Sequence, residues 1–149
     1  MDSSAPALDI VRENIAANGL EADRHSVECA DVFAHLRQLR DRAAAFDLIV
    51  LDPPKFAPTA AHAEKAARAY KDANLLAFKL LNPGGTLLTY SCSGGVPPDL
   101  FQKIVAGAAL DAGVNARIEA WHHAAADHPV LLSFPEGEYL KGLMCRVSA

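Results

Sequence analysis

The sequence predicts an α/β domain built on a mostly parallel, doubly wound sheet. Short apolar runs alternate with helix-like stretches of ten or more residues, the pattern of strands joined by crossover helices. The apolar run at residues 47–51 does not alternate with polar residues, as expected for a strand buried on both faces. A chain of 149 residues suits one domain.

The composition narrows the possible functions. No apolar run approaches the roughly 20 residues of a membrane span, and the N-terminus lacks the pattern of a signal peptide. The three cysteines, Cys29, Cys92 and Cys145, form no C-x-x-C pair, which argues against a disulfide framework and favours the cytoplasm. The net charge of -4 offers no general basic surface for nucleic acid, so most phosphate binding to an RNA would come from elsewhere.

The expected elements follow one another without a repeat or a linker. Helices are expected at residues 5–18, 33–39, 60–81 and 99–112, and strands at 25–29, 47–51, 86–90, 116–120 and 142–147. Ser4 is a candidate N-cap of the first helix and Gly19 its stop, and residues 82–85 read as a turn. Residues 122–141 are expected to be irregular.

Three polar segments lie where predicted strands end. They are Asp31, residues 52–55 and residues 91–95. Ligands of open α/β sheets bind beyond the carboxyl ends of the strands, so we expect these segments to share one rim.

Asp52 begins the sequence DPPKF. A carboxylate at the end of a buried strand is partly desolvated and needs a hydrogen-bond donor, which a planar amino-pyrimidine provides. Pro53 and Pro54 make a stiff corner without N–H groups, and Phe56 could stack on a base. The structural alternative is an aspartate that caps the next turn.

Cys92 lies in the sequence SCSGG, at the exit of a predicted strand. Beside the flexible Gly94 and Gly95 its thiol could be exposed, and a thiolate there could attack a substrate covalently. The alternative is a cysteine that serves only as a small apolar residue.

Together these motifs resemble a known family. DPPKF at 52–56, NPGGTLLTYSCS at 82–93 and HPVLLSFPEGEYLKGLMCRV at 128–147 are similar to the RNA 5-methylcytosine methyltransferases, nearest to the 23S ribosomal RNA cytosine-C5 group. The resemblance covers nearly the whole chain. It implies a Rossmann-like class I methyltransferase sheet, S-adenosyl-L-methionine as cofactor and RNA as substrate, with no metal.

The resemblance also implies roles for individual residues. Cys92 matches the nucleophile that adds to cytosine C6, and Asp52 matches the acid that holds or protonates N3. Asp2 matches the acid that binds the cofactor ribose, and Asp31 the acid that contacts its adenine. The resemblance also assigns Asp52 and Pro53 to cofactor binding, and Pro54, Lys55 and Phe56 to substrate binding.

The chain also departs from the family pattern. From the resemblance we expect residues 1–149 to correspond to the C-terminal part of the methyltransferase domain, without its first two strands, its glycine-rich cofactor loop or an RNA-binding N-terminal domain. From the family strand order 3-2-1-4-5-7-6 we expect residues 25–29 either to pair directly with the strand at 47–51 or to leave an edge that pairs with another chain. We therefore expect weak or no cofactor binding, a longer chain for RNA recognition and a possible homodimer.

Two other functions stay open from the sequence. An amino-methyltransferase of the same fold would modify a nitrogen without using Cys92, and a catalytically inert fragment would act only in self-association. Of the smaller features, His122, His123 and His128 could bind a metal but are better explained as a loop on the active-site rim, and Trp121 is expected to be an ordinary core residue.

Overall fold

The computed structural model describes residues 1–20, 22–57 and 59–149, without the side chains of residues 22 and 60. Its helices and strands, in chain order, are α1 (Ala5–Ala17), α2 (Val32–Asp41), β1 (Phe46–Leu51), α3 (Ala63–Lys79), β2 (Leu81–Ser91), α4 (Pro98–Ala112), β3 (Ala116–His122) and β4 (Lys141–Val147). Short 3-10 turns lie at Ala22–Arg24, Ala60–His62 and Pro135–Gly137. None of the described helices is long and apolar enough to cross a membrane.

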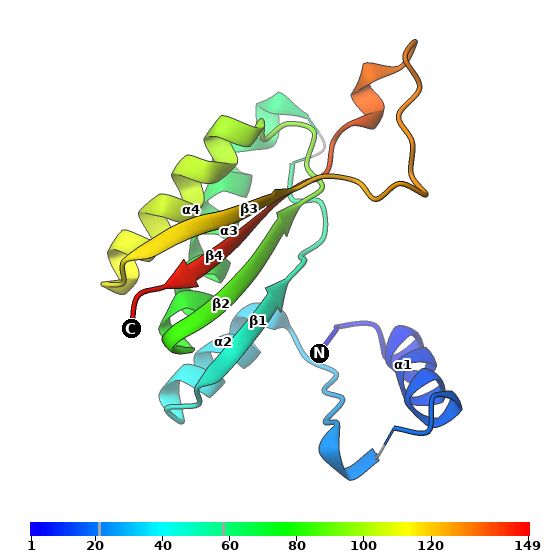
Figure 1. Cartoon of the computed structure of the whole chain (residues 1–149), viewed down its shortest axis with the longest axis vertical. Helices are drawn as coiled ribbons and strands as arrows, with labels where there is room; N and C mark the ends of the chain where they lie inside the picture. Colours follow the sequence, from blue (N-terminus) through cyan, green and yellow to red (C-terminus); the bar gives the residue numbers. More distant parts are fainter. Residues whose placement is uncertain (21, 58) are drawn as a thin grey trace.

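The four strands form one sheet in the order β1-β2-β4-β3 (Figure 1). This is the 4-5-7-6 part of the strand order implied by the resemblance. The expectation of a mostly parallel sheet holds only for β1 and β2, because β4 runs antiparallel to both of its neighbours. No long crossover helix lies between β3 and β4, and the chain returns through an irregular loop with one 3-10 turn.

The helices α2, α3 and α4 pack together on one face of the sheet, where the core lies (Figure 1). Tyr70 of α3 and Phe101 of α4 are buried there, with their rings edge to face at a centroid distance of 5.6 Å. Leu87 of β2 and Leu143 of β4 are buried in the same cluster. This helical layer supports the sheet beneath the carboxyl ends of β1 and β2.

The prediction that β1 is buried on both faces is wrong for the described residues. Ile49 and Leu51 face the helices, whereas Phe46, Leu48 and Val50 are 39%, 56% and 59% exposed. The described helices that contact the sheet lie on the opposite face, so nothing described covers these three side chains. The apolar sequence of β1 therefore gives one buried face and one exposed apolar face.

The predicted strand at residues 25–29 is also wrong. The segment forms one isolated parallel bridge, between Asp2 and Cys29, with the Asp2 amide donating to the Glu28 carbonyl at 3.1 Å. Within the described chain β1 pairs only with β2, so residues 25–29 do not move to β1 as one of our expectations had it. One bridge cannot make a strand because the ladder needs successive paired residues. Pairing of the β1 edge with another chain stays a prediction.

Several local predictions can be checked directly. Ser4 caps α1 by accepting from the Ala7 amide at 3.4 Å, and Gly19 takes a left-handed conformation with φ of 63° just after the helix. The prediction of a turn at residues 82–85 is wrong, because these residues lie within β2, which is longer than expected. Trp121 is 49% exposed, so its assignment to the core is wrong.

Candidate active site

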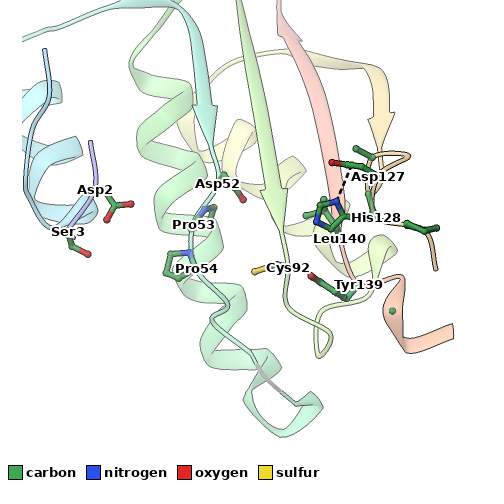
Figure 2. A pocket seen from close by; sticks show the side chains of 14 residues that line it. Asp2, Ser3, Asp52, Pro53, Pro54, Cys92, Asp127, His128, Tyr139 and Leu140 are labelled. Carbon is green, nitrogen blue, oxygen red and sulfur yellow. Dashed lines mark hydrogen bonds and ion pairs between the residues drawn. The ribbon is translucent and has the colours of Figure 1, made fainter. Parts of the chain in front are cut away.

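The site lies beyond the carboxyl ends of β1 and β2. Leu51 is opposite Thr89 in the parallel register, so both strands end at the same edge of the sheet. Asp52 follows β1 and is exposed, whereas the next residue, Pro53, is buried and anchors the corner. Cys92 follows β2 and is half-buried. Figure 2 shows the Cys92 sulfur pointing toward the side of Asp52 and Pro54.

A buried serine fixes the loop that carries Cys92. The hydroxyl of Ser93 accepts from the Ala57 amide at 3.0 Å and shares a hydrogen bond with the Tyr70 hydroxyl at 2.9 Å. Ala57 belongs to the loop after β1, and Tyr70 belongs to α3. The amide of Gly95 also donates to the Ala57 carbonyl, at 3.4 Å. The two loops of the site are therefore joined to each other and to the helical layer.

Lys141 supports the same loop from β4. Its side chain is buried, and its ammonium donates to the Ser93 carbonyl at 2.7 Å. Burial lowers the pKa of Lys141, the charge of Cys92 raises it, and the charge of Lys55 lowers it. Burial is the largest of these effects, so the pKa of Lys141 lies below its ordinary value.

A cavity of about 880 Å³ opens over these strand ends (Figure 2). Its lining residues are Asp2, Ser3, Asp52, Pro53, Pro54, Cys92, Ala124, Ala125, Asp127, His128, Pro129, Gly137, Tyr139 and Leu140. One wall comes from the strand ends and the N-terminal residues. The opposite wall comes from the loop between β3 and β4. The Asp52 carboxylate and the Cys92 thiol therefore share the cavity with His128 and Tyr139 of this loop.

The structure brings together five of the predicted site residues, namely Asp2, Asp52, Pro53, Pro54 and Cys92. The other three lie outside the lining. Asp31 caps α2 by accepting from the Ala34 amide at 2.9 Å. Phe56 is half-buried against Tyr70, with ring centroids 4.9 Å apart, and Lys55 places its ammonium 5.3 Å from the centroid of the Tyr139 ring.

The loop wall is the part of the site that sequence reasoning described least. The expectation that the histidine segment lies on the rim is confirmed for His128, whose Nδ1 lies 3.0 Å from Asp127 Oδ1. This hydrogen bond and the charge of His128 lower the pKa of the Asp127 carboxyl. Tyr139 was missed, although it belongs to the stretch that resembles the methyltransferase family.

The three histidines near this loop do not converge. His122 Nδ1 is bonded to the Tyr90 hydroxyl at 2.8 Å, and His123 Nδ1 lies 3.3 Å from Glu138 Oε1. His128 is bonded to Asp127. Within residues 1–20, 22–57 and 59–149, no group of three His, Cys, Asp or Glu side chains could hold a metal ion.

The thiol of Cys145 is buried and lies outside the lining of the cavity. Cys145 lies inside β4, and burial raises the pKa of its thiol to about 11. A thiol with such a pKa is overwhelmingly protonated near neutral pH, which makes it a poor nucleophile. Cys29 is exposed but lies outside the cavity lining. Among the three cysteines, Cys92 is the one that combines access with a place in the cavity.

Solved structures show which class of fold this is. The protein SMU.776, assigned as a methyltransferase and solved in complex with SAH, matches 97% of this chain and 37% of its own chain with a TM-score of 0.80 and 17% sequence identity. A methyltransferase homologue from Pyrococcus horikoshii matches 99% of this chain and 52% of its own with a TM-score of 0.67 and 17% identity. The chain therefore has the α/β fold of part of a class I methyltransferase, with a mixed four-stranded sheet.

Sequence relatives narrow this class. The chain is 57% identical over 147 residues to ribosomal RNA large subunit methyltransferase I of Shewanella amazonensis, and 51% identical to the protein of that name from Klebsiella pneumoniae. Each alignment covers 99% of this chain but only 37% of the relative. No family model matches the chain. It is thus homologous to these methyltransferases over somewhat more than a third of their length.

Proposed function

We propose that the chain is part of an S-adenosyl-L-methionine-dependent methyltransferase that acts on C5 of a cytosine in ribosomal RNA. The observation that carries this proposal is the shared cavity of Cys92 and Asp52, one following each of two parallel strands. The homology to large subunit methyltransferases supports 23S ribosomal RNA as the substrate, recognised with the help of a longer chain. An alternative with the same fold, methylation of a base nitrogen, does not require Cys92.

The residues present fit the cofactor in part. Asp2 and Asp52 bring two carboxylates to the cavity, and Pro53 packs beneath it, so hydrogen-bond acceptors face the space that a ribose or an amino group could enter. Asp2 Oδ1 already accepts from the Ser4 amide at 2.7 Å, which fixes the orientation of its carboxylate. We propose Asp2, Asp52 and Pro53 as cofactor-binding residues, with Asp31 at the adenine end. When bound, the cofactor supplies an electrophilic methyl group on a sulfonium.

The side chains of the site suit carbon methylation. Cytosine C5 is a weak nucleophile, and addition of the Cys92 thiolate to C6 makes C5 electron-rich. Asp52 holds or protonates N3, which accepts the electron density that the addition releases. After C5 has taken up the methyl group, loss of the C5 proton and departure of the Cys92 thiolate restore the aromatic ring. Pro54, Lys55 and Phe56 are proposed to position the base and its neighbours.

A trapping experiment tests this function. A short RNA containing 5-fluorocytosine cannot lose a proton from C5, so carbon methylation should leave it covalently attached to Cys92 when S-adenosylmethionine is present. We expect a shifted band on a denaturing gel for the parent and for Cys29→Ala, and none for Cys92→Ala. Methyl transfer that survives Cys92→Ala would instead support modification of a nitrogen.

Cofactor binding is tested separately by calorimetry with S-adenosylhomocysteine. One-to-one binding to this chain would support the cofactor site, with Asp2→Ala as the variant expected to weaken it. If no heat of binding is detected at millimolar S-adenosylhomocysteine, the result would favour the remaining candidate function, a chain that acts only in self-association. The specific observation in favour of that candidate is the exposed apolar face of β1.

A further inference from the structure

Tyr139 is an aromatic residue of the site to which the proposed chemistry gives no role. It belongs to the loop between β3 and β4 and lines the large cavity together with Asp52 and Cys92. Figure 2 shows its side chain pointing from the loop toward the side of Cys92. Among the described residues of this lining, Tyr139 supplies the one six-membered aromatic ring. The cavity therefore has a flat apolar surface in the wall opposite the strand ends.

The other two tyrosines have structural partners that Tyr139 lacks. The Tyr70 hydroxyl shares a hydrogen bond with Ser93 at 2.9 Å, inside the core. The Tyr90 hydroxyl is bonded to His122 at 2.8 Å. Within the described part of the chain, the Tyr139 hydroxyl forms no hydrogen bond, and the residue is 46% exposed. The packing of the fold therefore does not account for a tyrosine at this position.

The surroundings of Tyr139 leave its ring accessible. The residue also borders a second cavity, of about 520 Å³, next to the large one. The Lys55 ammonium lies 5.3 Å from the ring centroid and so connects the loop after β1 with the loop that carries Tyr139. A cation over one face of an aromatic ring leaves the other face open to a planar ligand. By contrast, Phe56 is half-buried against Tyr70 and lies outside the lining of the large cavity.

We propose that Tyr139 positions the target base by stacking on it, so that the base lies between the tyrosine ring and the strand ends that carry Asp52 and Cys92. A base must leave its own stack before an enzyme can act on it, and aromatic side chains can replace the stacking that it loses. This inference rests on the proposed function, because it names the residue that holds the base of the same substrate. It concerns binding alone, so it can be tested without cofactor and without methyl transfer.

The first test labels the full chain with 3-fluorotyrosine and follows its three tyrosines by fluorine NMR during a titration with cytidine 5′-monophosphate. Phenylalanine substitutions assign the resonances. A stacked base shifts the resonance of the ring on which it lies, so we expect a saturable shift of Tyr139 and none of Tyr70 or Tyr90. Ribose 5-phosphate, which lacks the base, should leave Tyr139 unchanged. An unchanged Tyr139 resonance, or an equal shift with ribose 5-phosphate, would overturn the proposal.

The affinity for the same nucleotide, measured by NMR of the backbone amides, tests the contact by substitution. We expect Tyr139→Ala to raise the Kd by about 5-fold or more, the lower end of what base–aromatic stacking contributes. Tyr139→Phe keeps the ring and should stay within about 2-fold of the parent. Phe134→Ala, at a 55% exposed aromatic residue of the same loop outside both cavity linings, is the matched control and should not change the Kd. Unchanged affinity in Tyr139→Ala, or an equal loss in the control, contradicts the stacking contact.

These results can be told apart from those of the trapping experiment at Cys92. If the covalent RNA adduct forms equally well with the parent and Tyr139→Ala, and the Kd is also unchanged, the proposed function stands and the role of Tyr139 is overturned. If no adduct forms but cytidine 5′-monophosphate shifts the Tyr139 resonance, the stacking contact stands and carbon methylation by this chain is overturned.

Discussion

Ser93 shows how a single residue joins several elements. Its side chain is fully buried, yet its hydroxyl is bonded to the Ala57 amide and the Tyr70 hydroxyl. Its carbonyl accepts from Lys141, and its amide donates to the Ser91 hydroxyl at 3.3 Å. Such a network stabilises the fold only while each member keeps its partner, because a buried polar group without one is costly.

We predict that Ser93→Ala lowers the free energy of unfolding by about 1–3 kcal/mol, because it leaves the buried Ala57 amide without its acceptor and the Tyr70 hydroxyl without its partner. Urea denaturation followed by circular dichroism measures the change. Ser133→Ala, at an exposed serine in the loop after β3, is the control and should be near neutral. A cost for Ser93→Ala no larger than that of the control would show that water replaces the lost hydrogen bonds.

At this scale the sequence predicts which strand-end residues line the cavity but not the residues that support them. The place of Asp52 and Cys92 could be predicted because strand ends in an α/β sheet are where ligands bind. Lys141 could not, since a lysine at a strand start is usually exposed, and only its pairing opposite Ser91 buries it. The contact of Phe56 with Tyr70 could not be predicted either, because an aromatic residue in a loop can face a ligand or the core.

At the scale of elements, the pairing of β2 with β4 depends on one glycine. Gly142 lies opposite Tyr90, and an added Cβ would lie 2.4 Å from the tyrosine ring. The ring stacks on His122, and its hydroxyl is bonded to the histidine Nδ1 at 2.8 Å. The Tyr90 ring of β2 therefore occupies the space above Gly142 of β4, where a larger residue would place its side chain, and also contacts His122 of β3.

We predict that Gly142→Ala lowers the free energy of unfolding by about 1–3 kcal/mol, because the ring must leave a well-packed position. Thermal or urea unfolding measures the loss, and Gly94→Ala is the matched control, since its added Cβ would meet nothing within 4 Å. Combining Gly142→Ala with Tyr90→Leu should recover part of the loss by removing the ring. No recovery in the double variant would place the strain in the backbone instead.

The elements themselves could be predicted where the pattern is local. The helices were predicted close to their observed bounds, because apolar spacing and caps such as Ser4 depend on near neighbours. The prediction of a strand at residues 25–29 was wrong because a strand forms only when another strand pairs with it. The local sequence pattern does not say whether such a partner is present. For the same reason, the exposure of one face of β1 could not be read from its apolar residues.

At the scale of the whole molecule, the described helices that pack on the sheet lie on one face (Figure 1). Phe46, Leu48 and Val50 of β1 are exposed on the other face, and β1 is also an edge strand. An open edge beside exposed apolar side chains favours association with another chain. We propose that this part of the surface mediates self-association when the chain is studied alone.

We predict that the isolated chain forms dimers or larger species as its concentration rises, and that Leu48→Glu combined with Val50→Glu keeps it monomeric. Sedimentation velocity at several concentrations measures this. Leu110→Glu, at a residue that is 78% exposed on α4, is the control and should associate like the parent. A parent that stays monomeric at every concentration would contradict the prediction and remove the support for a purely self-associating function.

The loop of residues 123–140 enters and leaves the sheet at neighbouring points, because His122 and Gly142 are paired across β3 and β4. Its two ends are thus clamped together while its middle forms a wall of the cavity. Insertions, deletions or exchanges within the loop can reshape that wall without shifting Cys92, which is held from below by Ser93 and Lys141. On the proposed function, the loop would determine which ligands enter the cavity, whereas the strand ends would hold the reacting thiol, so changes in the loop should alter ligand binding more than the position of Cys92.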